Sequence, residues 1–447
     1  MQKIRVRYAP SPTGFLHIGN ARTALFNYLF AARYQGEFII RIEDTDLERN
    51  VADSEKKQLE QLNWLGIKWT EGPDIGGSLG PYRQSERLTF YQKYTQILLE
   101  KKLAYKEYQN DNSKYVVRFK VPGETKYEFK DLIRGSLSFD SKEIEDWIIM
   151  KENGYPTYNY AVAIDDHLMA ISHVFRGEEH ITNTPKQMMI YQAFGWEIPT
   201  FAHISLILNE QKKKLSKRDK NVIQFIEKYM ILGYVPEALF NFLFLLGFAP
   251  KSNKTIFSLE EMVSLFDKTR FIKAPAIFDV PKLSFINSQY LKKMPLVDLV
   301  SQTAVFFNQA KIVISQEKLT KIVSLFQSRI SYLAETVRLY QSFFVEPKEV
   351  KEEFLTFIKE NKSFNLMQIL YNILYKLENF DSVNIKESIT RLEQRSSLKG
   401  KNLFILIRIA STLQMNGPHL PIYLELLGKE TVLKNIQTIL SFSFEKN

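Results

Sequence analysis

The chain has 447 residues, of which 45% are hydrophobic and 25% are charged. This composition is typical of a globular protein, and the length predicts about two to four domains. The chain contains no cysteine, which excludes disulfides and thiolate catalysis and removes the ligands that structural zinc sites usually use. The formal net charge of +10 suits nucleic acid as a partner, but it suits a lysine-rich soluble surface equally well.

The N-terminal residues include no apolar segment of the kind that signal peptides have. The longest apolar run, residues 238–249, is interrupted by Asn241 and is shorter than the roughly 20 residues of a membrane span. We therefore expect a cytoplasmic protein with no membrane partner. The six histidines are scattered, so we expect no metal ion held by protein side chains alone.

The first part of the chain alternates strand and helix patterns. Strand–loop–helix–strand order is typical of a parallel, nucleotide-binding sheet of the α/β class. In chain order, the patterns predict a strand at 4–8, a loop broken by Pro10, Pro12 and Gly14, a helix with Leu25, Leu29 and Ala32 on one face, a strand at 37–42, and helices at 54–65 and 88–99.

A change of pattern follows. From about residue 105 to 161 the helical period fades, which indicates an α+β module inserted into the sheet domain. Beyond this module the α/β pattern resumes, and after Lys220 the chain is predicted to be almost wholly helical. The predicted strands are 115–121, 135–139, 146–150, 168–174 and 202–208, and the predicted helices are 185–194, 222–231, 236–247, 319–344 and 364–377.

Residues 10–20 (PSPTGFLHIGN) lie between the first predicted strand and the first predicted helix. His17 and Gly19 begin that helix, where unpaired N–H groups and the helix dipole favour phosphate. Histidine can hydrogen-bond a phosphate oxygen, and Gly19 lets a nucleotide lie against the backbone. The four residues HIGN alone would also fit a simple helix cap. The full stretch predicts a nucleotide site.

Residues 211–220 (QKKKLSKRDK) form a basic run after the last predicted strand. Such runs are usually solvated surface or nucleic-acid contacts. This one lies at the C-terminal edge of the predicted sheet, where open α/β sheets bind ligands, which favours a ligand-binding role.

These segments resemble the class I aminoacyl-tRNA synthetases, and bacterial glutamyl-tRNA synthetase in particular. The resemblance includes residues 7–14 (RYAPSPTG), 17–20 (HIGN) and 41–46 (RIEDTD), and residues 214–218 (KLSKR) are similar to the family's second signature. Asn20 stands where the family usually has histidine or another polar residue. Leu215 replaces the commoner methionine or isoleucine. The resemblance is strong up to about residue 250 and moderate beyond, and it increases again at 400–430.

The resemblance implies a glutamate–tRNA ligase. Such an enzyme activates L-glutamate with ATP, with Mg²⁺ accompanying the nucleotide, and transfers it to the 3′-terminal adenosine of tRNA(Glu). The family is generally monomeric, and the absence of cysteine means that no zinc is expected. Catalytic roles are implied for His17, Lys214 and Lys217. The implied ATP-binding residues are Pro10, Ser11, Pro12, Thr13, Gly14, His17, Ile18, Gly19, Asn20, Leu208, Lys214, Leu215, Ser216, Lys217 and Arg218.

A glutamate side chain is best met by a planar guanidinium. Arg176 matches the family's glutamate-binding arginine, and Arg7 is a second candidate. Tyr158 matches a tyrosine of the same pocket, while Glu43 and Ser11 match residues that meet the substrate's α-ammonium and carboxylate groups.

Each of these residues also has a plainer explanation. Arg176 could pair with Glu178 or Glu179, Tyr158 could belong to the core, and Glu43 could form a surface ion pair. Together and in chain order, the five candidates indicate a site for an acid rather than for the amide that glutaminyl-tRNA synthetase binds.

The resemblance also implies the domain order. A Rossmann-like catalytic domain (1–86 and 162–210) carries an inserted acceptor-binding module (87–161). A helical stem-contact domain with the KLSKR loop (211–292) and a helical anticodon-binding region (293–447) follow. Arg329 matches an anticodon-reading arginine.

Two other functions are compatible with parts of the pattern. One is an RNA-binding protein derived from a decayed synthetase, and the other is a small-molecule nucleotidyltransferase with a similar HIGN element. Two intact signatures argue against decay, and the long helical half argues against a small-molecule enzyme. Whether tRNA(Gln) is also glutamylated is left open.

Overall fold

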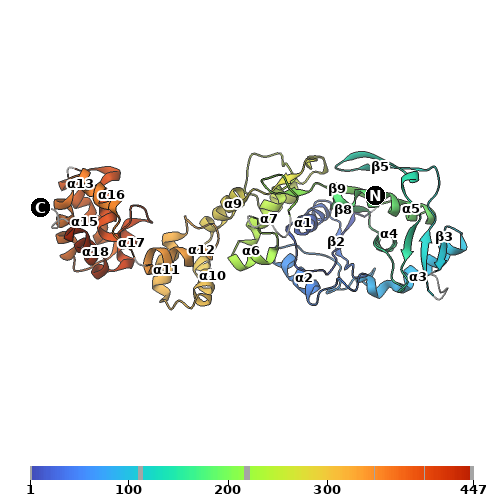
Figure 1. The fold of residues 1–447 in the computed structure, drawn as a ribbon, viewed down its shortest axis with the longest axis horizontal. Coiled ribbons are helices and arrows are strands. Elements are labelled where there is room, and N and C mark those ends of the chain that lie inside the picture. Colours follow the sequence, from blue (N-terminus) through green and yellow to red (C-terminus); the bar gives the residue numbers. More distant parts are fainter. Residues whose placement is uncertain (1–2, 109–113, 216–221, 347, 397, 443–447) are drawn as a thin grey trace. The chain divides into compact units, whose positions relative to one another are not determined.

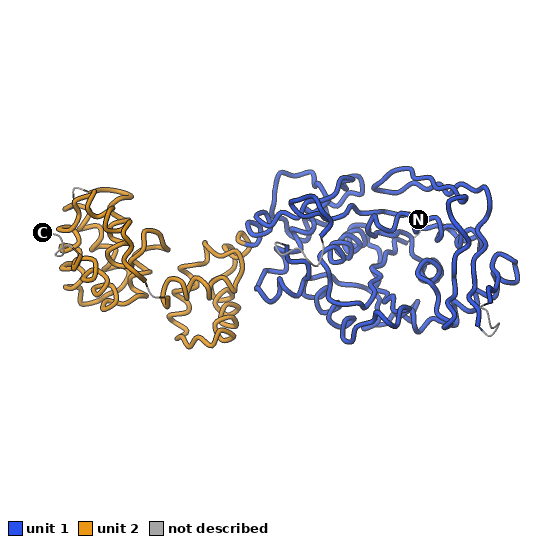
Figure 2. The backbone as a smooth tube through the Cα atoms, in the orientation of Figure 1, with its two compact units in different colours: residues 1–287 blue, residues 288–447 orange. Residues whose placement is uncertain are grey.

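The computed structural model describes residues 3–108, 114–215, 222–346, 348–396 and 398–442 (Figure 1). The chain divides into two compact units, residues 1–287 and residues 288–447 (Figure 2). The division falls within helix α9 (Val280–Lys293). Ser216, Lys217 and Arg218 of the second signature lie outside the described residues.

A four-stranded parallel sheet lies at the centre of the first unit. Its strands are β1 (Arg5–Tyr8), β2 (Glu37–Ile40), β8 (His173–Gly177) and β9 (Thr200–Ile204), in the order β2-β1-β8-β9. All four are largely buried and rich in aliphatic or aromatic residues, as expected for a sheet covered on both faces. The parallel β–loop–α–β start predicted from the sequence is confirmed.

The strand order determines where a ligand can bind. The chain leaves β1 toward β2 on one side, whereas β8 and then β9 are added on the other side. The connections therefore diverge between β1 and β8, and the crevice at the C-terminal ends of these two strands is the usual ligand site of such sheets.

Helix α1 (Ile18–Arg33) connects β1 to β2 and packs on the sheet and on α7 (Pro236–Leu245). Leu25 and Leu29 are buried as predicted, but Ala32 is exposed, so its assignment to the packed face was wrong. Phe30, on another side of the helix, is buried as well, with its ring centroid 4.7 Å from that of Phe175. The helix is covered from two sides, which widens its buried face beyond the predicted stripe.

The inserted region contains two antiparallel elements. A three-stranded sheet joins β3 (Ala104–Tyr108), β4 (Tyr115–Phe119) and β7 (Trp147–Met150), and a hairpin joins β5 (Lys126–Asp131) to β6 (Gly135–Asp140). The three strands predicted here are confirmed. The patterns missed β3 and β5, because both are rich in charged residues; β3 is exposed at four of its five residues, and β5 is largely exposed on one face.

The predicted strand at 168–174 was wrong over most of its length. Helix α4 (Tyr158–Leu168) ends there, Ala170 adopts a left-handed backbone with φ 52°, and β8 begins only at His173. The apolar run was therefore a helix end, a turn and a strand start. The strand predicted at 202–208 is divided into β9 and the short β10 (Ile207–Leu208).

The predominantly helical character after Lys220 is confirmed, except for the short strand β11 (Ala276–Ile277) beside β10. The helix predicted at 319–344 is divided into helices at Gln316–Phe326 and Glu335–Tyr340, and the Ser331 N–H donates to the Glu335 carboxylate (2.8 Å) at the start of the second one. None of the helices in the described residues is long and apolar enough to cross a membrane. The remaining helices are α2 (Ser54–Trp64), α3 (Leu88–Glu100), α5 (Thr184–Phe194), α6 (Ile226–Leu232), α8 (Leu259–Leu265), α10 (Leu296–Gln309), α11 (Gln316–Phe326), α12 (Glu335–Tyr340), α13 (Glu352–Glu360), α14 (Phe364–Tyr375), α15 (Ser382–Arg395), α16 (Gly400–Thr412), α17 (Leu420–Leu427) and α18 (Lys429–Ser441).

Candidate active site

A cavity of about 610 Å³ opens at the C-terminal ends of β1 and β8. This is the crevice that the strand order identifies as the ligand site. Many of the predicted site residues converge on it from distant parts of the chain. The predicted residues that line it are Arg7, Pro10, Ser11, Thr13, Asn20, Glu43, Tyr158 and Arg176.

The first signature forms the loop and helix start on one side of this cavity. His17 is the N-cap residue of α1, and its Nδ1 accepts the Gly19 N–H at 3.1 Å. A Cβ at Gly19 would lie 3.4 Å from that nitrogen, in van der Waals contact with the imidazole. The side chain of Ile18 is fully buried. The structure therefore exposes no part of Ile18 to a ligand.

A segment downstream of the second signature lies directly against the first. The Ile18 N–H donates to the Gln224 carbonyl (2.7 Å), and the Ile226 N–H donates to the Leu16 carbonyl (3.0 Å). The rings of His17 and Phe225 meet edge to face, with centroids 5.8 Å apart. These contacts bring residues 224–226 against the first signature, although about 200 residues separate the two segments in the sequence.

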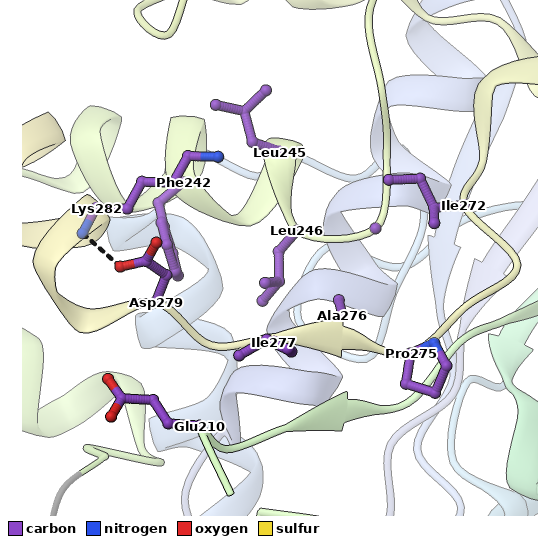
Figure 3. A pocket seen from close by; sticks show the side chains of 11 residues that line it. Glu210, Phe242, Leu245, Leu246, Ile272, Pro275, Ala276, Ile277, Asp279 and Lys282 are labelled. Carbon is purple, nitrogen blue, oxygen red and sulfur yellow. Dashed lines mark hydrogen bonds between the residues drawn. The ribbon is translucent and has the colours of Figure 1, made fainter. Parts of the chain in front are cut away.

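The described beginning of the second signature lies beside β10. Leu208 and Lys214 form an antiparallel bridge, Leu215 is buried, and Lys214 is exposed. A separate cavity of about 690 Å³ lies nearby, between α7 and β11 (Figure 3). Its described lining is mainly apolar, with side chains such as Leu246 and Ile277. The cavity at β1 and β8 is therefore the better site for a charged substrate.

Arg176 points from β8 into the floor of the site and is only 5% exposed. Its Nη1 donates to the Gln187 carbonyl oxygen and its Nη2 to the Thr184 hydroxyl, both at 2.8 Å. Its Nε donates to His203 Nε2 at 3.0 Å. All three partners are uncharged acceptors in these bonds, and no described carboxylate lies within ion-pair distance of Arg176. The pairing with Glu178 or Glu179 considered above does not occur in the structure.

A balanced ionic network lies beside Arg176. Asp166 accepts from Arg7 Nε and Nη2, both at 3.1 Å, and from Arg41 Nη1 at 2.7 Å. Burial alone would raise the pKa of Asp166, but the charges of the two arginines outweigh this effect and lower it. The network contains three guanidinium groups and three carboxylates, those of Arg7, Arg41, Arg87, Glu43, Asp165 and Asp166.

Glu43 is the carboxylate of this network that reaches the cavity. It is 8% exposed and accepts from Arg41 Nη2 at 3.2 Å. Burial raises the pKa of Glu43 to about 7, and Arg41 and Arg7 counteract this rise only in part. A positively charged ligand group would stabilise its ionised form.

Tyr158 begins α4 and is half-buried on the cavity wall, so it does not belong to the core. Its Oη lies 3.2 Å from His180 Nδ1. Sequence reasoning did not select His180, although it lies in the same VFRGEEH segment as Arg176. The same reasoning overlooked Asp165 and Asp166, for which the available signal was two adjacent acids in an otherwise apolar helix.

Arg329 belongs to the second unit. It is exposed, and its Nη2 donates to the Gly417 carbonyl at 2.8 Å. The segment from 400 to 430, which the sequence singled out, therefore lies against the residue predicted to read the anticodon.

Comparisons with known proteins agree with this arrangement. Residues 3–113 and 107–285 match the model "tRNA synthetases class I (E and Q), catalytic domain", and residues 295–440 match an anticodon binding domain. The chain is 52% identical over 441 residues to the glutamate–tRNA ligase of Acholeplasma laidlawii, with 98% of each chain covered. It is 46% identical over 480 residues to that of Bacillus subtilis, with 98% of this chain and 99% of the relative covered.

Solved structures give the same result over the full length. The crystal structure of the glutamate tRNA ligase from Elizabethkingia meningosepticum in complex with its amino acid matches with a TM-score of 0.87 at 34% identity. The match covers 98% of this chain and 99% of that one. The resemblance seen in the two signatures is thus confirmed, and the chain belongs to the glutamate–tRNA ligase family of class I aminoacyl-tRNA synthetases.

Proposed function

We propose that this chain activates L-glutamate with ATP and transfers the glutamyl group to the 3′-terminal adenosine of tRNA(Glu). The observation that carries the proposal is Arg176, a buried guanidinium at the cavity with no described carboxylate partner. A buried charge is costly unless an opposite charge meets it. The side-chain carboxylate of glutamate supplies that charge, in the bidentate geometry that a guanidinium favours.

Four neighbouring groups fit the rest of the amino acid. Glu43 accepts the α-ammonium group, and Ser11 and Tyr158 border the space for the remaining polar atoms. Arg7 adds positive charge to the same wall, and its bidentate pair with Asp166 holds it in place. The arrangement distinguishes an acid from an amide, because an amide would leave the charge of Arg176 unmet.

The ATP phosphates then bind between the two signatures. The glutamate α-carboxylate attacks the α-phosphorus, and pyrophosphate leaves. Negative charge grows on the phosphate oxygens, and the imidazole at the start of α1 and the cations of the KLSKR loop stabilise it. We assign this role to His17, Lys214 and Lys217, and Mg²⁺ enters as part of the ATP substrate. No protein nucleophile is required.

The tRNA-binding assignments follow the domain limits expected from the sequence. The module at 87–161 receives the acceptor end, and the region at 293–447 binds the anticodon, with Arg329 as one contact. We further propose that the protein acts in the cytoplasm as a monomer and uses no zinc.

Pyrophosphate exchange with glutamate, ATP and tRNA(Glu) tests the proposal. Lys217→Ala should reduce exchange strongly, whereas Lys228→Ala, at an exposed position on α6, should leave it near the parental rate. Arg176→Ala should raise the KM for glutamate by at least about 30-fold, because losing one partner of a buried charge pair costs about 2 kcal/mol or more. A folded parent protein without glutamate-dependent exchange would refute the proposal.

A further inference from the structure

His203 contacts the guanidinium of Arg176 from the neighbouring strand. The two residues lie directly opposite each other in the parallel pair of β8 and β9. Arg176 Nε donates to His203 Nε2 at 3.0 Å, and the guanidinium carbon lies 5.2 Å from the ring centre of Phe201, two residues before His203. His203 is fully buried. The orientation of Arg176 therefore depends on the imidazole as well as on Gln187 and Thr184.

The partners of His203 determine its tautomer. A guanidinium has only donors, so the lone pair of this contact must belong to His203 Nε2. The proton of the neutral ring then lies on Nδ1, where it is donated to Asp131 Oδ2 at 2.7 Å. The imidazole can thus accept from Arg176 at Nε2 because its proton lies on Nδ1, where it is donated to Asp131.

Asp131 is itself held firmly. It ends β5 of the inserted hairpin and is 2% exposed. Its Oδ1 accepts the backbone N–H groups of Ile133 (2.9 Å) and Arg134 (2.8 Å), and its Oδ2 accepts the backbone N–H of His203 at 3.1 Å. These bonds fix the carboxylate, so it can fix the imidazole in turn.

We propose that Asp131 and His203 are positioning residues that hold Arg176 in the orientation needed to bind the side-chain carboxylate of glutamate. The inference rests on the proposed function, because it requires Arg176 to meet the substrate. It adds that a residue of the inserted module, 45 positions before Arg176 in the sequence, contributes to the choice of amino acid. The alternative is that the contact merely anchors the hairpin to the sheet.

A matched pair of variants separates these alternatives. The amide of glutamine can place an acceptor near the position of Nε2, whereas that of asparagine mimics Nδ1. His203→Gln therefore keeps the contact with Arg176, and His203→Asn keeps only the contact with Asp131. We expect His203→Asn to raise the KM for glutamate about tenfold, which is the change in affinity expected from losing one hydrogen bond to a charged group. His203→Gln should raise it at most about threefold, and neither should change the KM for ATP.

A purely structural role predicts a different pattern. Equal effects of the two variants on the KM for glutamate, or equal rises in the KM values for glutamate and ATP, would overturn the inference. If His203→Asn does not fold, Asp131→Asn decides alone, since it keeps an oxygen for the backbone N–H groups but loses the charge that fixes the imidazole. A raised KM for glutamate with an unchanged KM for ATP in that variant supports the inference, and an unchanged KM for glutamate, or equal rises in both KM values, overturns it.

Arg176→Ala distinguishes failure of this inference from failure of the proposed function. If Arg176→Ala leaves the KM for glutamate unchanged, the proposed binding role of Arg176 fails. If Arg176→Ala raises it and His203→Asn does not, only the positioning role fails. In the Arg176→Ala background, His203→Asn should have no further effect, because coupled residues are not additive.

Discussion

Replacing Glu43 by glutamine should stabilise the first unit at neutral pH while weakening glutamate binding. Glu43 is buried, and its pKa rises from 4.5 to about 7 in the folded chain. The fold therefore favours the protonated, uncharged form. Glutamine has the same shape without the charge, and its oxygen can still accept from Arg41.

The sign and size of the effect follow from this shift. A folded-state pKa above the unfolded value means that the folded chain binds the proton more tightly, so stability is greatest at low pH and is lost as pH rises from 4.5 to about 7. A shift of about 2.5 units corresponds to about 3 kcal/mol at 1.36 kcal/mol per unit. The free energy of unfolding of the variant should equal that of the parent below about pH 4 and should exceed it by about 3 kcal/mol near pH 8.

The chain offers a convenient probe for this measurement. All four tryptophans, Trp64, Trp69, Trp147 and Trp196, lie in the first unit. Urea unfolding followed by tryptophan fluorescence therefore reports that unit, and the parent and Glu43→Gln can be compared from pH 4 to pH 8. Glu48→Gln, which removes an exposed charge from the same segment, serves as the control.

Two results would contradict the reasoning. If the difference in free energy of unfolding between the variant and the parent does not change with pH, Glu43 is not destabilised by burial. If the variant is more stable but keeps the parental KM for glutamate, Glu43 does not meet the α-ammonium group. The expected result is higher stability with a KM raised about tenfold or more, since a hydrogen-bonded charge is lost.

Three further perturbations test separate parts of the site. Asp166→Asn removes the carboxylate shared by Arg7 and Arg41 and should lower the free energy of unfolding by about 3 kcal/mol, the cost of breaking a buried pair; a loss below about 1 kcal/mol in urea unfolding would contradict this. Gly19→Ala adds a methyl group where we propose that the nucleotide lies against the backbone, and it should raise the KM for ATP several-fold in pyrophosphate exchange without changing the KM for glutamate. Arg329→Gln should raise the KM for tRNA(Glu) in aminoacylation and leave the KM for ATP unchanged, whereas an unaltered KM for tRNA would remove Arg329 from the interface.

Local patterns predicted the elements whose burial follows a simple period. The start of the sheet, helix α1 and the two signatures were found because aliphatic runs, a cap and a basic loop are visible within about 20 residues of sequence. Strands β3 and β5 were missed because their exposed faces carry charges, and α4 was missed because Asp165 and Asp166 interrupt an apolar helix. These acids are buried only because arginines from other elements meet them.

The remaining features of the site depend on contacts that no local pattern contains. His203 meets Asp131 across 72 positions, and Asp166 meets Arg41 across 125. A buried histidine in the strand TFAHI is a detectable signal, but its partner is not. The candidate residues could therefore be selected from the sequence one at a time, whereas the network that orients them required the fold.

If Arg176 binds the substrate as proposed, the charge balance of the floor explains why the site would favour an acid. The neighbouring network contains equal numbers of guanidinium and carboxylate groups, so it has little net negative charge with which to neutralise Arg176. Gln187, Thr184 and His203 orient Arg176 without neutralising it, and burial lowers the pKa of His203, which keeps the imidazole uncharged. If an acidic residue stood in the place of His203, it would orient the guanidinium equally well but would also neutralise its charge. A neutral orienting group leaves the charge of Arg176 for the substrate, and a carboxylate then gains far more from the site than an amide of the same size.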